Sequence, residues 1–162
     1  MSETEMMQRR GFVARIAGLV AVGVTGGRLW AELPSGKSPT PITVYKSSTC
    51  GCCTKWVDHI RANGFAPEVH DEEEMEALKN RLMVPEGVRS CHTAQIDGYL
   101  IEGHVPASDI RRLLSERPKT AGLAVPGMPS LTPGMAPPGV DPRDYEVVSF
   151  QLDGSTRLFS QH

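Results

Sequence analysis

Apolar residues change their spacing several times along the chain, and each change predicts a boundary between a strand and a helix. The apolar run at residues 42–45 predicts a strand. The apolar positions of residues 53–63 then recur at helical spacing, and Asn63-Gly64 supplies a left-handed stop for that helix. A second strand is predicted at residues 66–70, so the pattern opens as strand, helix, strand.

The next helix is expected to begin at a capping signal. Asp71 is a favoured N-cap residue and Glu74 follows three residues later, which is the spacing of a capping box. The acidic run also places negative charge at the positive end of the helix dipole. Met75, Leu78 and Leu82 give this predicted helix one apolar face.

Two short strands and a third helix complete the regular pattern. The strands are predicted at residues 93–96 and 99–102, because Asp97-Gly98 between them is a strong signal for a two-residue hairpin turn. Pro106 suits the first turn of the helix, whose inward positions are Ile110, Leu113 and Leu114. The element order predicts an α/β fold, a small sheet with helices packed on it.

Residues 118–142 interrupt this pattern with seven prolines, four glycines and two methionines. They show no periodicity, so we expect an ordered flap without regular structure. A C-terminal hairpin is predicted from residues 145–152 and 155–159, which flank Asp153-Gly154. The pattern leaves open whether this hairpin extends the main sheet or packs separately.

The beginning of the chain has the features of an export signal. Arg9-Arg10 precedes an uncharged apolar stretch at residues 16–27, and Ala31 offers a small residue at a cleavage point. We therefore predict a twin-arginine leader at residues 1–31. A retained membrane anchor is the alternative, but the stretch is shorter than the roughly 20 residues that a span needs.

Residues 32–41 are rich in proline, serine and glycine and predict a tether. The tether would join the leader to a single domain at residues 42–162, which is an ordinary length for one domain. Export through this leader predicts the periplasm, with no membrane contact after the leader is removed. Cysteines in that oxidising compartment need a disulfide partner or a metal.

Charge and cysteine content exclude some classes of function. The 17 basic and 19 acidic side chains form no basic stripe, which argues against a nucleic-acid partner. The four cysteines are too few for a disulfide scaffold, and three of them fall within four positions, Cys50, Cys52 and Cys53. Three cysteines cannot all pair with one another, so a plain structural disulfide does not explain the cluster.

The motif Cys50-Gly51-Cys52-Cys53 is predicted to lie at a corner between the first strand and the first helix. Free backbone N–H groups and the positive end of the helix dipole face the side chains there, which favours thiolate over thiol. Thiolates are both nucleophiles and ligands for soft metals. The site is therefore expected to carry out redox chemistry, to bind metal, or both.

The element order and the C-x-x-C spacing at the first corner resemble the thioredoxin superfamily, whose sheet is small and mixed. The segment 87–93 is similar to the one that precedes the third strand of that family and lies against the C-x-x-C corner. The resemblance implies that Cys91 and His92 face the other cysteines. It also implies that His104, at a later corner, lies on the same rim.

Two departures from the thioredoxin pattern favour metal binding. Cys52 stands in the spacer where thioredoxins commonly have proline, and His92 stands at the position of their cis-proline. The resemblance implies that these changes weaken disulfide exchange and add ligands. Sulfur and imidazole donors suit Cu(I) and, less selectively, zinc.

Several separated motifs together resemble a narrower family. They are C-G-C-C at 50–53, S-C-H-T at 90–93, E-G-H-V-P at 102–106 and G-L-A-V-P-G-M-P at 122–129. The chain is similar over most of residues 42–159 to the CopG-like periplasmic proteins of copper-resistance systems. That resemblance implies a thioredoxin-like fold and copper held by the cysteines and a neighbouring histidine, with a role in changing or buffering the oxidation state of copper.

The expected metal ligands, for one or several Cu(I) ions, are the cysteines and the histidines of these motifs, namely Cys50, Cys52, Cys53, Cys91, His92 and His104. Met128 and Met135 lie in the predicted flap and are candidates for shielding copper, because thioether sulfur also suits Cu(I). His59 and His70 are expected on the surface, and the terminal His162 carries no signal.

Three functions stay open. The protein could bind Cu(I) and interconvert it with Cu(II), as a copper oxidoreductase. It could be a thiol-disulfide oxidoreductase in which Cys50 attacks and Cys53 resolves. It could also be a non-enzymatic copper chaperone or buffer. The expected partners are copper ions and other periplasmic copper-handling proteins.

Overall fold

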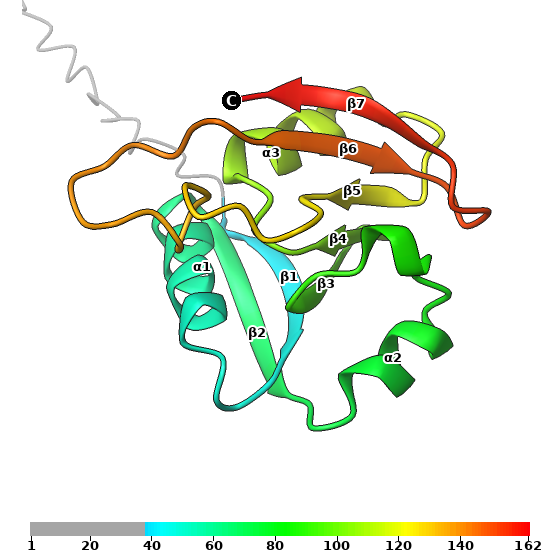
Figure 1. Ribbon diagram of the computed structural model, residues 1–162, viewed down its shortest axis with the longest axis horizontal. Coiled ribbons are helices and arrows are strands. Elements are labelled where there is room, and N and C mark those ends of the chain that lie inside the picture. Colours follow the sequence, from blue (N-terminus) through cyan, green and yellow to red (C-terminus); the bar gives the residue numbers. More distant parts are fainter. Residues whose placement is uncertain (1–37) are drawn as a thin grey trace, which may run out of the picture. The chain divides into compact units, whose positions relative to one another are not determined.

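A computed structural model describes residues 38–162, which form a seven-stranded mixed sheet, three α-helices and one short 3-10 helix (Figure 1). The predicted leader and all but the last residues of the predicted tether lie outside the described residues. The first strand begins at Thr40, two residues inside the predicted tether. Of the helices in the described residues, none has the length and apolar character needed to cross a membrane.

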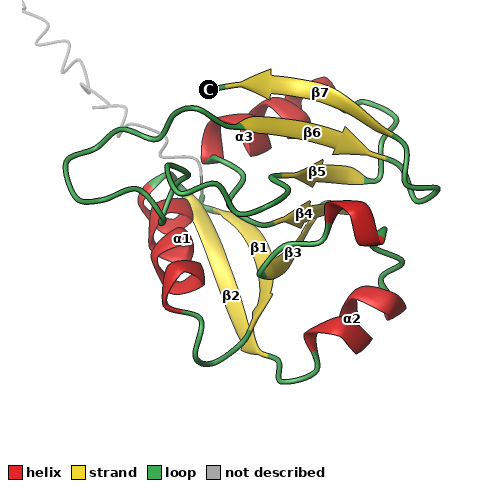
Figure 2. Cartoon of the chain, viewed as in Figure 1, coloured by secondary structure: helices red, strands yellow, loops and turns green. Residues whose placement is uncertain are grey.

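The strands run in the order β2-β1-β3-β4-β5-β6-β7 across the sheet (Figure 2). The β1/β2 and β4/β5 pairs are parallel and the other neighbours are antiparallel. The strand bounds are β1 Thr40–Lys46, β2 Phe65–Asp71, β3 His92–Ile96, β4 Tyr99–Glu102, β5 Gly122–Ala124, β6 Glu146–Phe150 and β7 Thr156–Gln161. The helices are α1 Gly51–Ala62, α2 Met75–Arg81 and α3 Ala107–Glu116, with the 3-10 helix η1 at Glu86–Val88.

The predicted fold class, a small mixed sheet with flanking helices, is confirmed. The predicted C-terminal hairpin also forms, as β6 and β7, and it extends the main sheet because β6 pairs with β5. Asp97 and Gly98 both adopt positive φ, as the predicted two-residue turn between β3 and β4 requires. Gly64 also adopts positive φ at the end of α1, as its stop signal predicts.

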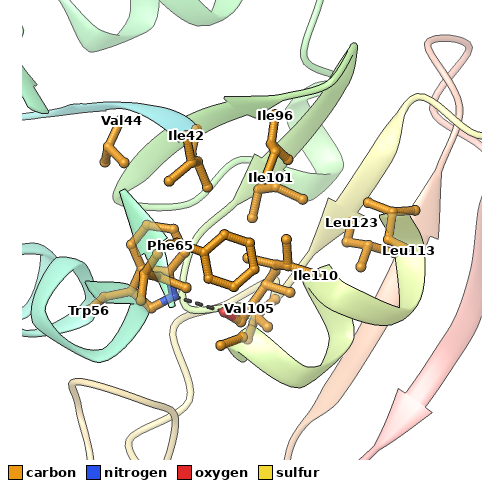
Figure 3. Packing of buried hydrophobic residues seen from close by; sticks show 14 of the residues in the cluster. Ile42, Val44, Trp56, Phe65, Ile96, Ile101, Val105, Ile110, Leu113 and Leu123 are labelled. Carbon is orange, nitrogen blue, oxygen red and sulfur yellow. Dashed lines mark hydrogen bonds between the residues drawn. The ribbon is translucent and has the colours of Figure 1, made fainter. Parts of the chain in front are cut away.

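The main hydrophobic core joins α1 and α3 to the sheet, as Figure 3 shows. Trp56 of α1 is fully buried, and its Nε1 donates a hydrogen bond to the carbonyl of Val105, 2.9 Å away (Figure 3). Phe65, Ile101 and Ile110 pack in the same cluster. Burial of each such side chain contributes about 1.5–3 kcal/mol. This core therefore fixes the start of α1 against the segment that leads into α3.

The predicted cap of the second helix is wrong. Asp71 is the last residue of β2, and its Oδ1 binds Lys46 Nζ at 2.8 Å. Helix α2 begins at Met75 with Glu74 at the N-cap position, and no side-chain cap bond forms there among the described residues. The long-range ion pair with the largely buried Lys46 holds the Asp71 carboxylate away from the helix, so tertiary structure overrides the local signal.

The proline-rich segment also departs from its prediction, because it contains the strand β5. This strand has three residues, Gly122 to Ala124, all buried between β4 and β6. A strand this short and this buried shows no alternation in the sequence. Gly122 is required by close packing, since a Cβ there would overlap the carbonyl oxygen of Leu100.

The rest of the proline-rich segment is irregular, as predicted, and runs beside α1 (Figure 1). It touches the first turns of that helix at Gly134. A Cβ built on Gly134, whose φ is +84°, would lie 2.7 Å from the backbone nitrogen of Trp56 and 3.1 Å from the carbonyl oxygen of Cys52. In the structure, the flap is the irregular segment of residues 125–145, and Gly134 in its middle contacts the cysteine corner.

Candidate metal centre

Cys50 is the N-cap residue of α1, which begins two residues earlier than its apolar periodicity predicts. The Sγ of Cys50 lies 3.3 Å from the backbone nitrogen of Cys53, whose N–H points toward it. A sulfur in this position faces the free N–H groups and the positive end of the helix dipole. The predicted placement of the motif at a strand-to-helix corner is therefore correct.

The cysteines of this corner differ in their bonding. Cys50 and Cys53 form a disulfide, with their Cα atoms 5.3 Å apart. Cys52 and Cys91 are the free cysteines of the described chain. The Sγ of Cys52 lies 3.5 Å from that of Cys50, so Cys52 points into the site and not away from it.

Cys91 reaches the corner through the pairing of β3 with β1. The two strands are antiparallel, and His92 at the start of β3 lies opposite Lys46 at the end of β1. The residue before His92 is therefore held beside the loop that leads from Lys46 to Cys50. The four sulfur atoms of Cys50, Cys52, Cys53 and Cys91 all lie within 4.8 Å of one another.

A second cluster shares the sulfur of Cys91. The Sγ of Cys91 lies 3.4 Å from Nδ1 of His92 and 3.2 Å from Nε2 of His104. The three ligand atoms of this second cluster also lie within 4.8 Å of one another. The structure therefore brings together all six residues predicted as metal ligands, with Cys91 as the common member. Their binding of metal stays a prediction.

His104 is oriented by the flap. Its Nδ1 lies 2.7 Å from the carbonyl oxygen of Pro133, and since a carbonyl can only accept, Nδ1 carries the proton and donates it. In the neutral ring, Nε2 is then an unprotonated nitrogen that faces Cys91. This is the arrangement by which second-shell carbonyls fix the tautomer of a metal-binding imidazole.

His92 is fully buried against Trp56, with the ring centroids 4.3 Å apart. Its Nε2 has no hydrogen-bond partner among residues 38–162. Buried ring nitrogens normally have a partner, so this one needs an explanation. Nδ1, and not Nε2, is the nitrogen that faces Cys91, so a soft metal ion shared with that sulfur would be bound by Nδ1 and would leave the proton on Nε2. The sulfur and imidazole donors of the site fit such an ion.

The environment sets the proton content of these ligands. Burial lowers the pKa of His92 well below its ordinary 6.5, with further lowering by the neighbouring His104 and by Lys79. Burial also lowers the pKa of His104. Both imidazoles are therefore neutral at neutral pH and can bind metal without losing a charge-bearing proton.

The pKa of Cys91 shifts in the opposite direction. Burial, and then the nearby Cys52, raise the pKa of the Cys91 thiol to about 11. Without metal, Cys91 is therefore a protonated thiol at neutral pH. Binding of a soft metal ion would displace that proton, which makes metal affinity dependent on pH.

Behind the second cluster lies a buried ion pair that the sequence pattern did not predict. Lys79 Nζ lies 2.8 Å from Glu102 Oε2, and both side chains are almost completely buried. Thr93 accepts a hydrogen bond from Lys79 at 2.7 Å and donates one to Glu102. One signal was present, because Lys79 falls between Met75 and Leu82 on the apolar face of α2.

The other histidines have structural contacts. His59 was expected on the surface but is half-buried, and its Nε2 accepts a hydrogen bond from the backbone N–H of Ala107 at 3.2 Å, which caps α3. His70 is exposed, as expected, and stacks on Tyr45. The terminal His162 gave no signal in the sequence, yet its Nε2 lies 2.8 Å from Asp109 Oδ2.

The flap supplies a carbonyl to the centre, and its two methionines lie in different environments. Met128 is 49% exposed. Met135 is half-buried and directly follows Gly134, which packs on the first turns of α1. The shielding of copper by either thioether stays a prediction.

Sulfur and imidazole groups that converge at the corner of a mixed α/β sheet define this chain as a candidate soft-metal-binding protein. Two solved structures are similar to it, described as copper resistance protein copG in form 1 and form 2. Each has 44% sequence identity and a TM-score of 0.69, and each match covers 76% of this chain and 98% of the other. The chain belongs to the CopG family of copper resistance proteins, and the predicted family is thereby confirmed.

A family model described as a protein of unknown function, DUF411, matches residues 88–135. This match contains Cys91, His92 and His104 but not the C-G-C-C corner. No curated protein matches the chain.

Proposed function

We propose that this protein works in copper handling or resistance outside the cytoplasm and holds Cu(I) in a centre of cysteine and histidine ligands, Cys50, Cys52, Cys53, Cys91, His92 and His104. The observation that carries this proposal is the position of Cys91. Its sulfur belongs both to the group of four sulfurs and to the group with the two imidazoles. A single shared sulfur joins the groups into one continuous set of donors.

The donor set favours Cu(I) among the common metals. Thiolate sulfur is soft, and the two imidazoles are neutral, which is the form that binds metal. Four thiolates carry more negative charge than one monovalent ion neutralises. We therefore propose several Cu(I) ions with bridging sulfurs, bound after a dithiol reductant has reduced the Cys50–Cys53 disulfide and has itself been oxidised to a disulfide. The copper ions then displace the protons of the thiols.

The periplasm is the proposed location. The support is the twin-arginine pattern at the start of the chain, together with the resemblance to the CopG-like periplasmic proteins. Similar solved structures are described as copper resistance proteins. In that compartment a centre of this kind could store copper, pass it to another periplasmic copper-handling protein, or change its oxidation state.

The proposal is tested by titrating the fully reduced protein with Cu(I) without oxygen and recording X-ray absorption at the copper edge. We expect more than one tightly bound copper per chain, with sulfur ligands and a smaller nitrogen contribution. Chains that hold less than one tightly bound copper would refute the proposal. Cycles of mild oxidation and reduction, followed by electron paramagnetic resonance, then separate an oxidoreductase, which forms Cu(II) reversibly, from a chaperone or buffer.

A second candidate, a thiol-disulfide oxidoreductase, is favoured by one observation. Cys50 and Cys53 form a disulfide at the N-terminus of a helix, where a thiolate is stabilised. This function predicts that turnover of a disulfide substrate survives replacement of Cys91 and His92 by Ala. The copper function predicts that the same double replacement removes most copper binding.

A further inference from the structure

We propose that the buried ion pair of Lys79 and Glu102 is a positioning device for one half of the metal centre, the half formed by Cys91, His92 and His104. The inference rests on the proposed function, because it assigns a role toward that centre. Neither Lys79 nor Glu102 is among the expected ligands. Both act through the backbone segments that carry the ligands.

Glu102 holds the segment that contains Cys91 and His92 at both of its ends. Its Oε2 accepts a hydrogen bond from the backbone N–H of Ser90 at 3.0 Å, just before Cys91. Its Oε1 accepts one from the hydroxyl of Thr93, just after His92. The carboxylate therefore spans the two ligand residues, and its two oxygens fix the turn that presents them.

The same residue is continuous with the third ligand. Glu102 ends β4, and Gly103 and His104 follow it directly. The backbone N–H of Gly103 donates to the carbonyl of His92 at 3.0 Å, which ties the two ligand segments together. The carbonyl of Glu102 accepts from the N–H of Val125 at 3.0 Å, at the start of the flap that orients His104.

Lys79 completes the arrangement from α2. Its ammonium group donates to Glu102 Oε2 and to Thr93 Oγ1. Burial raises the pKa of Glu102, and the paired ammonium opposes that rise and favours the charged carboxylate. An ion pair buried this deeply is a poor source of stability, because the loss of hydration offsets most of the attraction. Fixing the geometry of the segments around it is a better account of its presence.

The test compares two buried carboxylates, each changed to an amide. Glu102→Gln removes the charge beside Cys91, and Asp109→Asn is the matched control. Asp109 is also buried, but it binds Ser160 and His162. The first measurement needs no copper. In oxidised protein that also carries Cys52→Ser, Cys91 is the free cysteine of the described chain, and its rate of alkylation by iodoacetamide is followed.

We expect Glu102→Gln to raise the alkylation rate severalfold, because Cys91 leaves its half-buried position, and Asp109→Asn to leave the rate unchanged. An unchanged rate in folded Glu102→Gln would overturn the inference. If that variant does not fold, as judged by circular dichroism, Thr93→Val is measured instead. It removes the hydroxyl that both charged groups bind and keeps the charges, and an unchanged rate there overturns the inference equally.

The second measurement uses the chain with all four cysteines, fully reduced, and Cu(I). We expect Glu102→Gln to weaken copper binding by about 10- to 100-fold and to reduce the nitrogen contribution in X-ray absorption, with Asp109→Asn like the wild type. If the unmodified protein binds no copper, the proposed function fails on its own. The alkylation rates still decide whether the ion pair positions Cys91.

Discussion

The Sγ of Cys91 lies 3.2 Å from Nε2 of His104, although the two residues belong to different strand ends. Cys91 immediately precedes β3, and His104 follows β4, so the β3–β4 hairpin returns the chain to the same edge of the sheet. The cysteine corner follows β1, and β1 pairs with β3 of this hairpin. The ends of adjacent strands supply Cys91, His92 and His104, and the start of α1 supplies the other three cysteines.

Replacement of Cys91 by Ser is expected to have the largest effect of any single cysteine change on Cu(I) binding. The shared sulfur is lost from both clusters at once, so copper per chain and affinity should both fall. Because serine has nearly the same shape, the free energy of unfolding should change by about 1 kcal/mol or less. Anaerobic titration and urea unfolding measure the two effects. Ser48→Ala, an exposed change in the loop before the corner, is the control.

Copper capacity is expected to depend on the thiol state of the protein. A disulfide offers no thiolate, so oxidised protein keeps the sulfurs of Cys52 and Cys91 as its thiol ligands within the described chain. Reduction should raise the number of copper ions bound per chain. The measurement is copper per chain before and after treatment with a reductant that is then removed. Equal copper content in the two forms would contradict the role given to Cys50 and Cys53.

The metal-free protein should lose stability in acid. The pKa values of His92 and His104 are lowered by burial in the folded state, while in the unfolded chain they return to about the ordinary 6.5. The unfolded state then binds more protons as the pH falls below that value, which favours unfolding. Urea unfolding across this range should show the loss. His92→Gln should reduce it, whereas His70→Gln, at an exposed position, should not.

The metal-free protein should also lose stability in alkali. Folding holds the pKa of Cys91 at about 11, above its ordinary 9.0, so the unfolded thiol ionises first as the pH rises between these values. Ionisation of the unfolded chain then favours unfolding. The free energy of unfolding should decline across this interval in the wild type. Cys91→Ser removes the titrating group, and an equal decline in that variant would contradict the prediction.

The contact between the flap and α1 is expected to contribute more to stability and to Cu(I) binding than the backbone conformation of the flap does. Gly134→Ala and Gly139→Ala both place a side chain at positive φ, +84° and +80°, which costs about 1–2 kcal/mol each. At Gly134 the new Cβ also meets Trp56, whereas at Gly139 nothing lies within 4 Å. The extra collision should cost roughly a further 1–3 kcal/mol.

Urea unfolding of the two glycine variants measures this difference directly. Because Gly134 follows Pro133, the carbonyl of which binds His104, only Gly134→Ala should also weaken Cu(I) binding. Equal stability and equal copper affinity in the two variants would show that the flap does not support the centre.

The elements with regular periodicity could be predicted from the sequence. Helix α1 shows this, because its buried residues Cys53, Trp56, Val57 and Ile60 recur at helical spacing. The convergence of Cys91 on the corner came only from the resemblance to a known fold. Periodicity alone carries no information on which strand ends meet.

The features that were missed depend on contacts between distant residues. Asp71 has every local sign of a cap, yet its carboxylate is held by Lys46 from another strand. The strand β5 is too short to show a pattern, and it forms because β4 and β6 offer it hydrogen bonds on both sides. In the sequence, Glu102 is an ordinary residue of a predicted strand. Only the folded structure places Lys79 beside it.

The flap leaves the sheet at β5 and returns at β6, which are direct neighbours. Both ends of the flap are therefore fixed to adjacent strands. Length changes near its outer part would leave the sheet register intact, as surface loops generally allow. Length changes near Pro133 and Gly134 would disturb the candidate metal centre, because there the flap binds His104 and packs on the first turns of α1.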